Sequence, residues 1–139
     1  MLYQHASPAR QALAEWLDTW EWDQFATLTF DDRWGPTGPS ADRCLVLTRG
    51  WLEALPHRPG FFVAVERGRL GRTHAHALIA PGAGGAHVAN RDISDRWKFG
   101  RDQIRRFDPT KKSGHYLSKY VTKDPDVWDI GGALREVPV

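Results

Sequence analysis

The sequence predicts an α+β domain in which an antiparallel sheet carries its helices mainly on one face. Three observations support this fold class. Helical patterns and strand-like runs follow one another in the order α-β-α-β-β-α-β-α. The two central runs are separated only by a short glycine-flanked turn at 68–71, which predicts a hairpin. Neither an internal repeat nor a linker interrupts the 139 residues, so we expect a single domain over 1–139.

Each element follows from a local pattern. Ser7 and Pro8 are typical of a helix start, and an apolar stripe with helical spacing extends that helix over 8–20 (Leu13, Trp16, Leu17, Trp20). The run 25–30 is β-branched and aromatic, as in a strand. The remaining patterns predict a loop at 31–39, a helix at 41–55 behind Ser40, strands at 61–67 and 73–80, a short helix from Asn90 to Gly100, a strand at 102–107 and a helix from 113 or 114 to 124.

The positive charge is concentrated in one segment. The formal net charge of the chain is +2, but residues 96–123 carry nine Lys or Arg against two Asp, which gives +7. The other parts carry −3 over 1–60, +1 over 61–95 and −3 over 124–139. A charged run is usually a solvated surface. Because this one surrounds candidate nucleophiles, it favours a polyanionic substrate.

Composition excludes several other classes of protein. The apolar runs are no longer than strands, far short of a membrane span, and the N-terminus lacks the basic and apolar regions of a secretory signal. Cys44 is the single cysteine, which excludes an internal disulfide and a cysteine-based zinc cluster, and we expect it to be buried on a helix. A cytoplasmic protein is the simplest interpretation.

A His-x-His pair interrupts the otherwise apolar strand at 73–80. His74 and His76 point to the same face because strand side chains alternate. In most such pairs one imidazole packs and the other is solvated, but a buried polar group needs a partner, and a divalent ion is one. Glu66 joins the pair if paired residue numbers sum to 140, opposite His74, or to 142, opposite His76. An odd sum would place the carboxylate on the other face.

Two imidazoles and one carboxylate would leave coordination positions open for phosphate and water. Mixed nitrogen and oxygen ligands suit one Mg²⁺ or Mn²⁺ ion, and zinc could also bind. A domain stabilised by a structural zinc ion is disfavoured, because only three ligands are identifiable.

Tyrosines and lysines repeat with helical spacing towards the C-terminal end. Tyr116 and Tyr120 share one helix face, and Lys119 and Lys123 form a second pair beside them. The alternative is a core face with solvated lysines. A phenol has a pKa of about 10, so it must be activated to attack at neutral pH. A lysine three residues from each tyrosine could hold a phosphate or lower the phenol pKa. Together with a metal, the pattern indicates phosphodiester cleavage.

Three strings together resemble motifs of the HUH endonuclease superfamily, specifically the two-tyrosine replication initiators (Rep) of bacterial plasmids and single-stranded DNA phages. The string FATLTF at 25–30 resembles the first motif, His74-Ala75-His76 the His-hydrophobe-His motif, and YLSKYVTK at 116–123 the Tyr-x-x-Lys motif. Glu66, in a Glu-Arg-Gly turn, stands where relatives keep a third metal ligand. The resemblance spans about residues 25–124.

The resemblance implies a five-stranded, ferredoxin-like sheet with Mg²⁺ or Mn²⁺ on its central strands. It also implies nicking of single-stranded DNA at an origin, with a 5′-phosphotyrosine link and a free 3′-OH that primes synthesis or rejoins strands. Two departures are present. Ala75 is smaller than the usual central hydrophobe, and no helicase region is found, so a host or separate helicase would have to unwind the DNA.

The expected metal ligands, nucleophiles and assisting residues are therefore His74, His76 and Glu66; Tyr116 or Tyr120; and Lys119 with Lys123. The candidates for DNA contacts are basic residues of the +7 segment and one tryptophan in the polar loop after the first strand: Arg101, Arg105, Arg106, Lys111, Lys112 and Trp34. Two alternatives stay open at this point. They are a single-tyrosine transposase or relaxase on the same fold, and a domesticated DNA-binding module that does not cleave.

Overall fold

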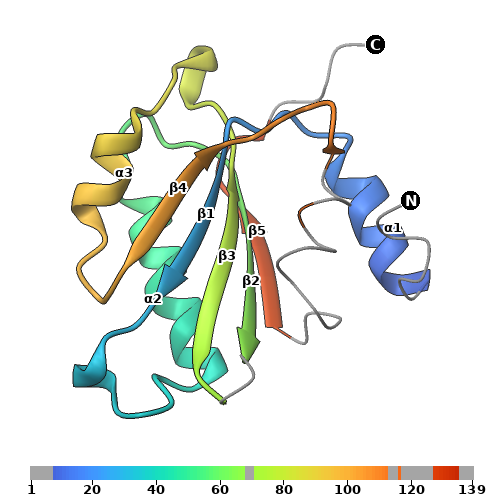
Figure 1. Cartoon of the computed structure of the whole chain (residues 1–139). Coiled ribbons are helices and arrows are strands. Elements are labelled where there is room, and N and C mark those ends of the chain that lie inside the picture. The colour runs from blue at the N-terminus through green and yellow to red at the C-terminus, as the bar shows by residue number, and fades with distance from the viewer. Residues whose placement is uncertain (1–7, 68–70, 113–115, 117–126, 135–139) are drawn as a thin grey trace.

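The structure is a computed structural model that describes residues 8–67, 71–112, 116 and 127–134. Five strands form one antiparallel sheet in the order β4-β1-β3-β2-β5 (Figure 1). The strands are β1 (Gln24–Thr29), β2 (Phe61–Arg67), β3 (Thr73–Ile79), β4 (Asp102–Arg106) and β5 (Val127–Gly131). The described helices are α1 (Pro8–Leu17), α2 (Ala41–Glu53) and α3 (Asn90–Arg96), with short 3-10 turns η1 (Asp32–Trp34) and η2 (Ala83–Gly85).

The connectivity from β1 to β4 is the βαββαβ order of a ferredoxin-like fold. Helix α2 joins β1 to β2, and α3 joins β3 to β4. Both helices pack on the same face of the sheet, whereas α1 packs on the opposite face (Figure 1). The predicted α+β class, the antiparallel sheet and the position of the helices mainly on one face are confirmed. None of the described helices is long and apolar enough to cross a membrane.

Two apolar layers, one on each face of the sheet, hold these elements together. Strand alternation directs Ala26, Leu28 and Phe30 to the α2 and α3 side, where Trp51 and Trp97 are also buried. On the other side Phe25 packs with residues of α1 and of the segments around 107 and 116 (Ala14, Leu17, Phe107, Tyr116). The second layer covers only part of its face, because the opposite end of β2 and β3 carries polar side chains there.

Helix α2 shows how local sequence positions an element. The Ser40 hydroxyl accepts a hydrogen bond from the Arg43 backbone N–H at 3.2 Å and caps the helix, as predicted. Cys44 lies on the inner face of the helix and is fully buried. Burial raises the pKa of its thiol to about 12, so the thiol stays protonated at neutral pH. The prediction of a buried cysteine on a helix is confirmed.

Element boundaries differ from the predicted ones by a few residues at most ends, and one strand was absent from the local pattern. Helix α1 ends at Leu17 rather than 20, and α2 ends at Glu53 rather than 55. Strand β5 pairs with β2 along the edge of the sheet and is joined to α2 by the Arg49–Asp129 ion pair. Apart from Tyr116, which is helical, the helix predicted from 113 or 114 to 124 lies outside the described residues.

Candidate functional site

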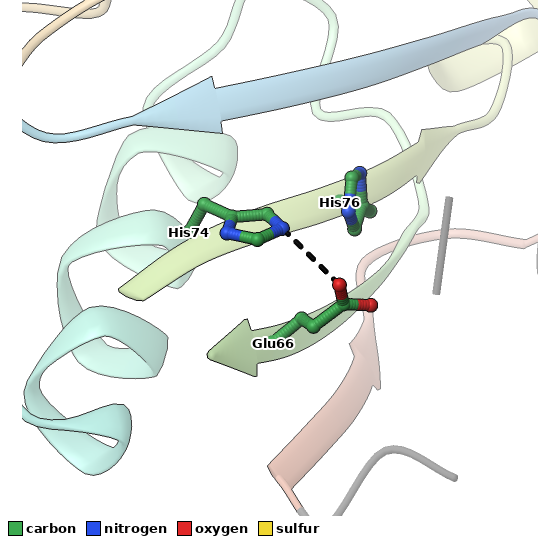
Figure 2. A group of neighbouring side chains, drawn as sticks. All are labelled: Glu66, His74 and His76. Carbon is green, nitrogen blue, oxygen red and sulfur yellow. Dashed lines mark ion pairs between the residues drawn. The ribbon is translucent and has the colours of Figure 1, made fainter. Parts of the chain in front are cut away.

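The β2–β3 hairpin brings the predicted metal ligands together. Glu66 pairs directly with His74, so paired residue numbers sum to 140, which is one of the two registers that the site requires. Alternation on β3 places His76 on the same face as His74. The three side chains converge above the central strands (Figure 2). We call the sheet face that carries them the metal face.

The distances within this group suit a single ion. One ligand atom from each of Glu66, His74 and His76 lies within 4.8 Å of the other two. Glu66 Oε1 and His74 Nε2 lie 3.5 Å apart. His76 is buried, while Glu66 and His74 are half-buried, so an ion held here would remain accessible from solvent. Two imidazole nitrogens and a carboxylate oxygen fit Mn²⁺, Mg²⁺ or Zn²⁺ and leave positions open for a substrate.

Neighbouring groups orient both imidazoles. His74 Nδ1 lies 3.4 Å from the Arg72 carbonyl oxygen, which can only accept a hydrogen bond. This contact favours the tautomer protonated at Nδ1 and leaves Nε2 for a metal. His76 Nδ1 lies 3.4 Å from the Thr27 hydroxyl, and the His76 ring stacks on Phe25 with a centroid distance of 5.8 Å. In both rings the Nδ1 contact therefore leaves Nε2 as the nitrogen for a shared ion.

Electrostatics couple two of the ligands. The hydrogen bond from His74 to the Glu66 carboxylate raises the pKa of His74 above its usual value, and the negative charge of Glu66 acts in the same direction. Burial opposes the shift, because it disfavours the charged imidazolium. Without a metal the pair is therefore predisposed to keep a proton, which an incoming cation must displace.

Tyr116 lies on the metal face, but its hydroxyl is engaged. The side chain is only 7% exposed, and its ring packs between Phe25 and Phe107 at centroid distances of 5.0 and 4.8 Å. The Asp108 backbone N–H donates a 2.7 Å hydrogen bond to the phenol oxygen. Because Phe25 also stacks on His76, one ring connects Tyr116 to the ligand group. Lys119, Tyr120 and Lys123 lie outside the described residues.

The sheet registers arrange further side chains in rows across the metal face. A row through Glu66 and His74 continues to Thr29 on β1. The next two rows, read from β4 to β5, are Gln103, Thr27, His76, Ala64 and Trp128, and Arg105, Phe25, Leu78, Phe62 and Ile130. The metal group thus lies between a basic edge strand, β4, and an aromatic one, β5.

The predicted basic residues divide between the two faces. Arg101, Arg105, Arg106, Lys111 and Lys112 are all exposed. Arg105 pairs with Phe25 and shares the metal face, whereas Arg106 pairs with Gln24, whose side chain lies on the other face. Arg101 lines a cleft of about 650 Å³ together with Thr29 and Arg72, and Thr29 pairs directly with His74.

Trp34 occupies a different environment from the one its loop suggested. Its half-buried ring packs edge-on against Phe30 and Phe99 at 5.6 Å and belongs to the apolar layer under α2. The tryptophans with exposed rings in the described part of the chain are Trp16 and Trp128. A role for Trp34 in base stacking stays a prediction, and its surroundings give it a packing role.

Three residues of the site were absent from the sequence-based assignment. Thr27 could have been found by alternation along 25–30, which places it on one face with Thr29. Arg72 immediately precedes the Thr-His-Ala-His string. Trp128 carried no local signal, because its place opposite Ala64 depends on the pairing of β5 with β2.

Comparison with known proteins agrees with this geometry. A family model for replication-associated proteins of the ORF2 type matches residues 23–125, which include every strand from β1 to β4 and all three candidate ligands. No curated protein and no solved structure matches the chain significantly. Since the match covers well over half of the sequence, the chain belongs to this family of ORF2-type replication-associated proteins.

Proposed function

We propose that the chain is a metal-dependent endonuclease of the HUH type. It would nick single-stranded DNA at a replication origin and transfer the cut strand through a 5′-phosphotyrosine intermediate. The observation that carries the proposal is the half-buried group of Glu66, His74 and His76, whose ligand atoms lie within 4.8 Å of one another. Membership of a replication-associated family supports DNA as the substrate and replication initiation as the context.

The ligand group defines the electrophilic side of the site. Glu66, His74 and His76 would hold one Mg²⁺ or Mn²⁺ ion, which when bound polarises the scissile phosphate and stabilises the charge that develops on it. Thr27 and the Arg72 carbonyl hold the imidazoles in the orientation that this requires. The ligands lie on two adjacent inner strands, β2 and β3, which supports a rigid, preorganised site.

We assign the nucleophile to Tyr120 and a positioning role to Tyr116. The phenol oxygen of Tyr116 already accepts a hydrogen bond from the Asp108 backbone, and its ring is enclosed by Phe25 and Phe107. A group held in this way anchors its segment to the metal face rather than approaching a phosphate. Tyr120, four residues on, repeats the Tyr-x-x-Lys pattern and is followed by Lys123.

The chemical step balances without a further reactant. The Tyr120 phenolate oxygen bonds to phosphorus, and the bond from phosphorus to the 3′ oxygen breaks. The leaving 3′ oxygen takes up a proton and becomes a free 3′-OH, while the 5′ end remains on the tyrosine as a phosphodiester. Lys119 and Lys123 would lower the phenol pKa or hold the phosphate. Attack by a 3′-OH in the reverse direction releases the tyrosine and rejoins strands.

The basic residues Arg101, Arg105, Arg106, Lys111 and Lys112 would contact the DNA backbone, and their number makes binding sensitive to salt. A separate helicase would open the duplex. The protein would act in the cytoplasm, where plasmid and phage DNA replicate.

A covalent capture experiment tests the proposal. The chain is incubated with Mn²⁺ and a randomised pool of labelled single-stranded DNA, and the products are resolved on a denaturing protein gel. We expect a slower-migrating protein–DNA band that is absent with EDTA and with a His76→Ala variant. DNA binding without any such band across a wide range of sequences would support a non-cleaving DNA-binding module instead.

A further inference from the structure

Two exposed tryptophan rings lie side by side on the metal face. Trp16 on α1 is 39% exposed and Trp128 on β5 is 41% exposed, and their ring centroids are 6.1 Å apart. Each ring is supported from the protein side by another aromatic ring. Trp128 contacts Phe62 at 5.9 Å, and Trp16 contacts Trp20 at 6.5 Å. The rings are thus held in place while part of each faces solvent, which is the arrangement of a preorganised contact surface.

The sheet register fixes the position of this pair relative to the metal group. Trp128 pairs with Ala64, and Ala64 pairs with His76, so all three lie in one row. Two inter-strand spacings separate β3 from β5, or about 10 Å. Ala64, the residue between them, is small and fully buried, so its side chain does not rise between His76 and the indole of Trp128. DNA at the metal centre that runs across the strands towards β5 would therefore meet these rings.

The chemistry of the pair suits bases rather than phosphates or a protein partner. The exposed Glu15 lies next to Trp16, and the basic side chain of Arg105 lies at the opposite edge of the metal face, on β4. The two rings together expose on the order of 200 Å², whereas a stable protein interface buries roughly 800 Å² on each partner. Aromatic faces of this size stack with any base, without a need for charge.

We propose that Trp16 and Trp128 form a base-stacking platform for single-stranded DNA on the β5 side of the metal centre. The inference rests on the proposed function in that DNA occupies the metal face. It adds a direction to the bound strand. The DNA backbone contacts Arg105 at the β4 edge, the scissile phosphate lies over the central strands, and bases stack on the two indoles at the β5 edge.

Binding measured in EDTA, where no cleavage occurs, tests the platform independently of nicking. The probes are a labelled oligo-dT of about 16 nucleotides and an abasic oligonucleotide of the same length. We expect Trp16→Leu and Trp128→Leu each to weaken oligo-dT binding by about tenfold. The abasic affinity and the slope of log K against log salt should stay unchanged, because neither residue contacts phosphate. Trp16→Phe and Trp128→Phe should retain most of the affinity, since they keep an aromatic face.

Intrinsic fluorescence and a matched control complete the test. Oligo-dT should quench the wild-type protein, and the Trp16→Phe/Trp128→Phe double variant, which still binds, should lose most of that quenching. Val46→Ala, at an exposed apolar side chain on the opposite face, should leave binding unchanged. The proposal is overturned if the leucine variants bind oligo-dT like the wild type, or if the double phenylalanine variant is quenched as fully.

A dimeric wild type that becomes monomeric in the leucine variants, with unchanged DNA affinity, would also overturn the proposal, since it identifies a protein interface. Failure of the covalent capture experiment alone would contradict the nicking activity and leave the platform standing. The two proposals can therefore fail separately.

Discussion

Glu66 lies directly opposite His74 on the β2–β3 hairpin, with 3.5 Å between Glu66 Oε1 and His74 Nε2. The pair is poised between two states. Without a metal, the carboxylate stabilises a protonated imidazole and raises the pKa of His74. With a metal, the same two side chains would become ligands together with His76. Proton and cation therefore compete for one centre.

Removing the charge of Glu66 should weaken metal binding. Glu66→Gln keeps the size of the side chain but takes away an anionic ligand, so we expect the Kd for Mn²⁺ to rise by at least about tenfold, or about 1.4 kcal/mol. Titration calorimetry or Mn²⁺ electron paramagnetic resonance measures it. The control is Asp95→Asn, an exposed carboxylate on α3 beneath the other face. An unchanged Kd in Glu66→Gln would remove Glu66 from the ligand set.

Metal affinity and the stability of the metal-free protein should respond to pH in opposite directions. Because the folded-state pKa of His74 is raised, its contribution to stability is fully present below the unfolded-state pKa of about 6.5 and is lost as pH rises through the folded-state pKa. Mn²⁺ binding should instead strengthen over the same rise, since the imidazole must lose its proton. Urea unfolding and Mn²⁺ titration between about pH 6 and pH 8 measure both trends. Parallel trends would contradict the Glu66–His74 coupling.

Thr27 should act on metal affinity through His76. Thr27→Val keeps the shape but removes the hydroxyl that contacts His76 Nδ1, and loss of such a partner typically costs about 10–100-fold in metal affinity or activity. Thr27→Ser keeps the hydroxyl and should stay close to the wild type. Calorimetric Mn²⁺ titration of the two variants decides the matter, and equal affinities would show that the Thr27 hydroxyl does not orient the ring.

The neighbouring arginines of β4 should differ in their effect on DNA binding. Arg105 shares the metal face and Arg106 lies on the other face, so the pair forms a natural control. Arg105→Gln should weaken binding to single-stranded DNA and reduce the salt slope by about one, whereas Arg106→Gln should have a smaller effect on both. Fluorescence anisotropy over a range of salt concentrations measures the slopes. A larger effect of Arg106→Gln would place the DNA on the opposite face.

Tyr116→Phe should affect stability more than chemistry. The substitution leaves the Asp108 N–H without its acceptor, which costs about 0.5–1.5 kcal/mol in the free energy of unfolding. Covalent capture of DNA should persist, because the proposed nucleophile remains, and urea unfolding together with the capture assay measures both. A fully folded Tyr116→Phe protein that forms no DNA adduct would show that Tyr116 itself attacks.

The parts of the site that the sequence predicted are those encoded by local periodicity. Alternation placed His74 and His76 on one face, and pairing across a hairpin limited Glu66 to two productive registers. The register itself depends on how the turn closes and on packing of both faces, so only the structure selected the pairing with His74.

The residues that sequence reasoning missed depend on long-range contacts. Strand β5 is short, its five residues include an aspartate and a glycine, and it gains its hydrogen bonds from β2, more than sixty positions earlier in the chain. Trp128 therefore gave no local sign of its place beside the metal group. Trp34 illustrates the converse, because a polar loop suggested exposure while packing against Phe30 and Phe99 half-buries the ring.

The central claim is that a tyrosine of this chain becomes covalently linked to DNA in a metal-dependent step, and mass spectrometry of the captured adduct tests it most directly. After nuclease and protease digestion of a reaction with Mn²⁺, we predict a nucleotide mass on the peptide that contains Tyr120, and none after a reaction in EDTA. Cut DNA that carries a free 5′-phosphate, with no modified tyrosine peptide, would contradict the account.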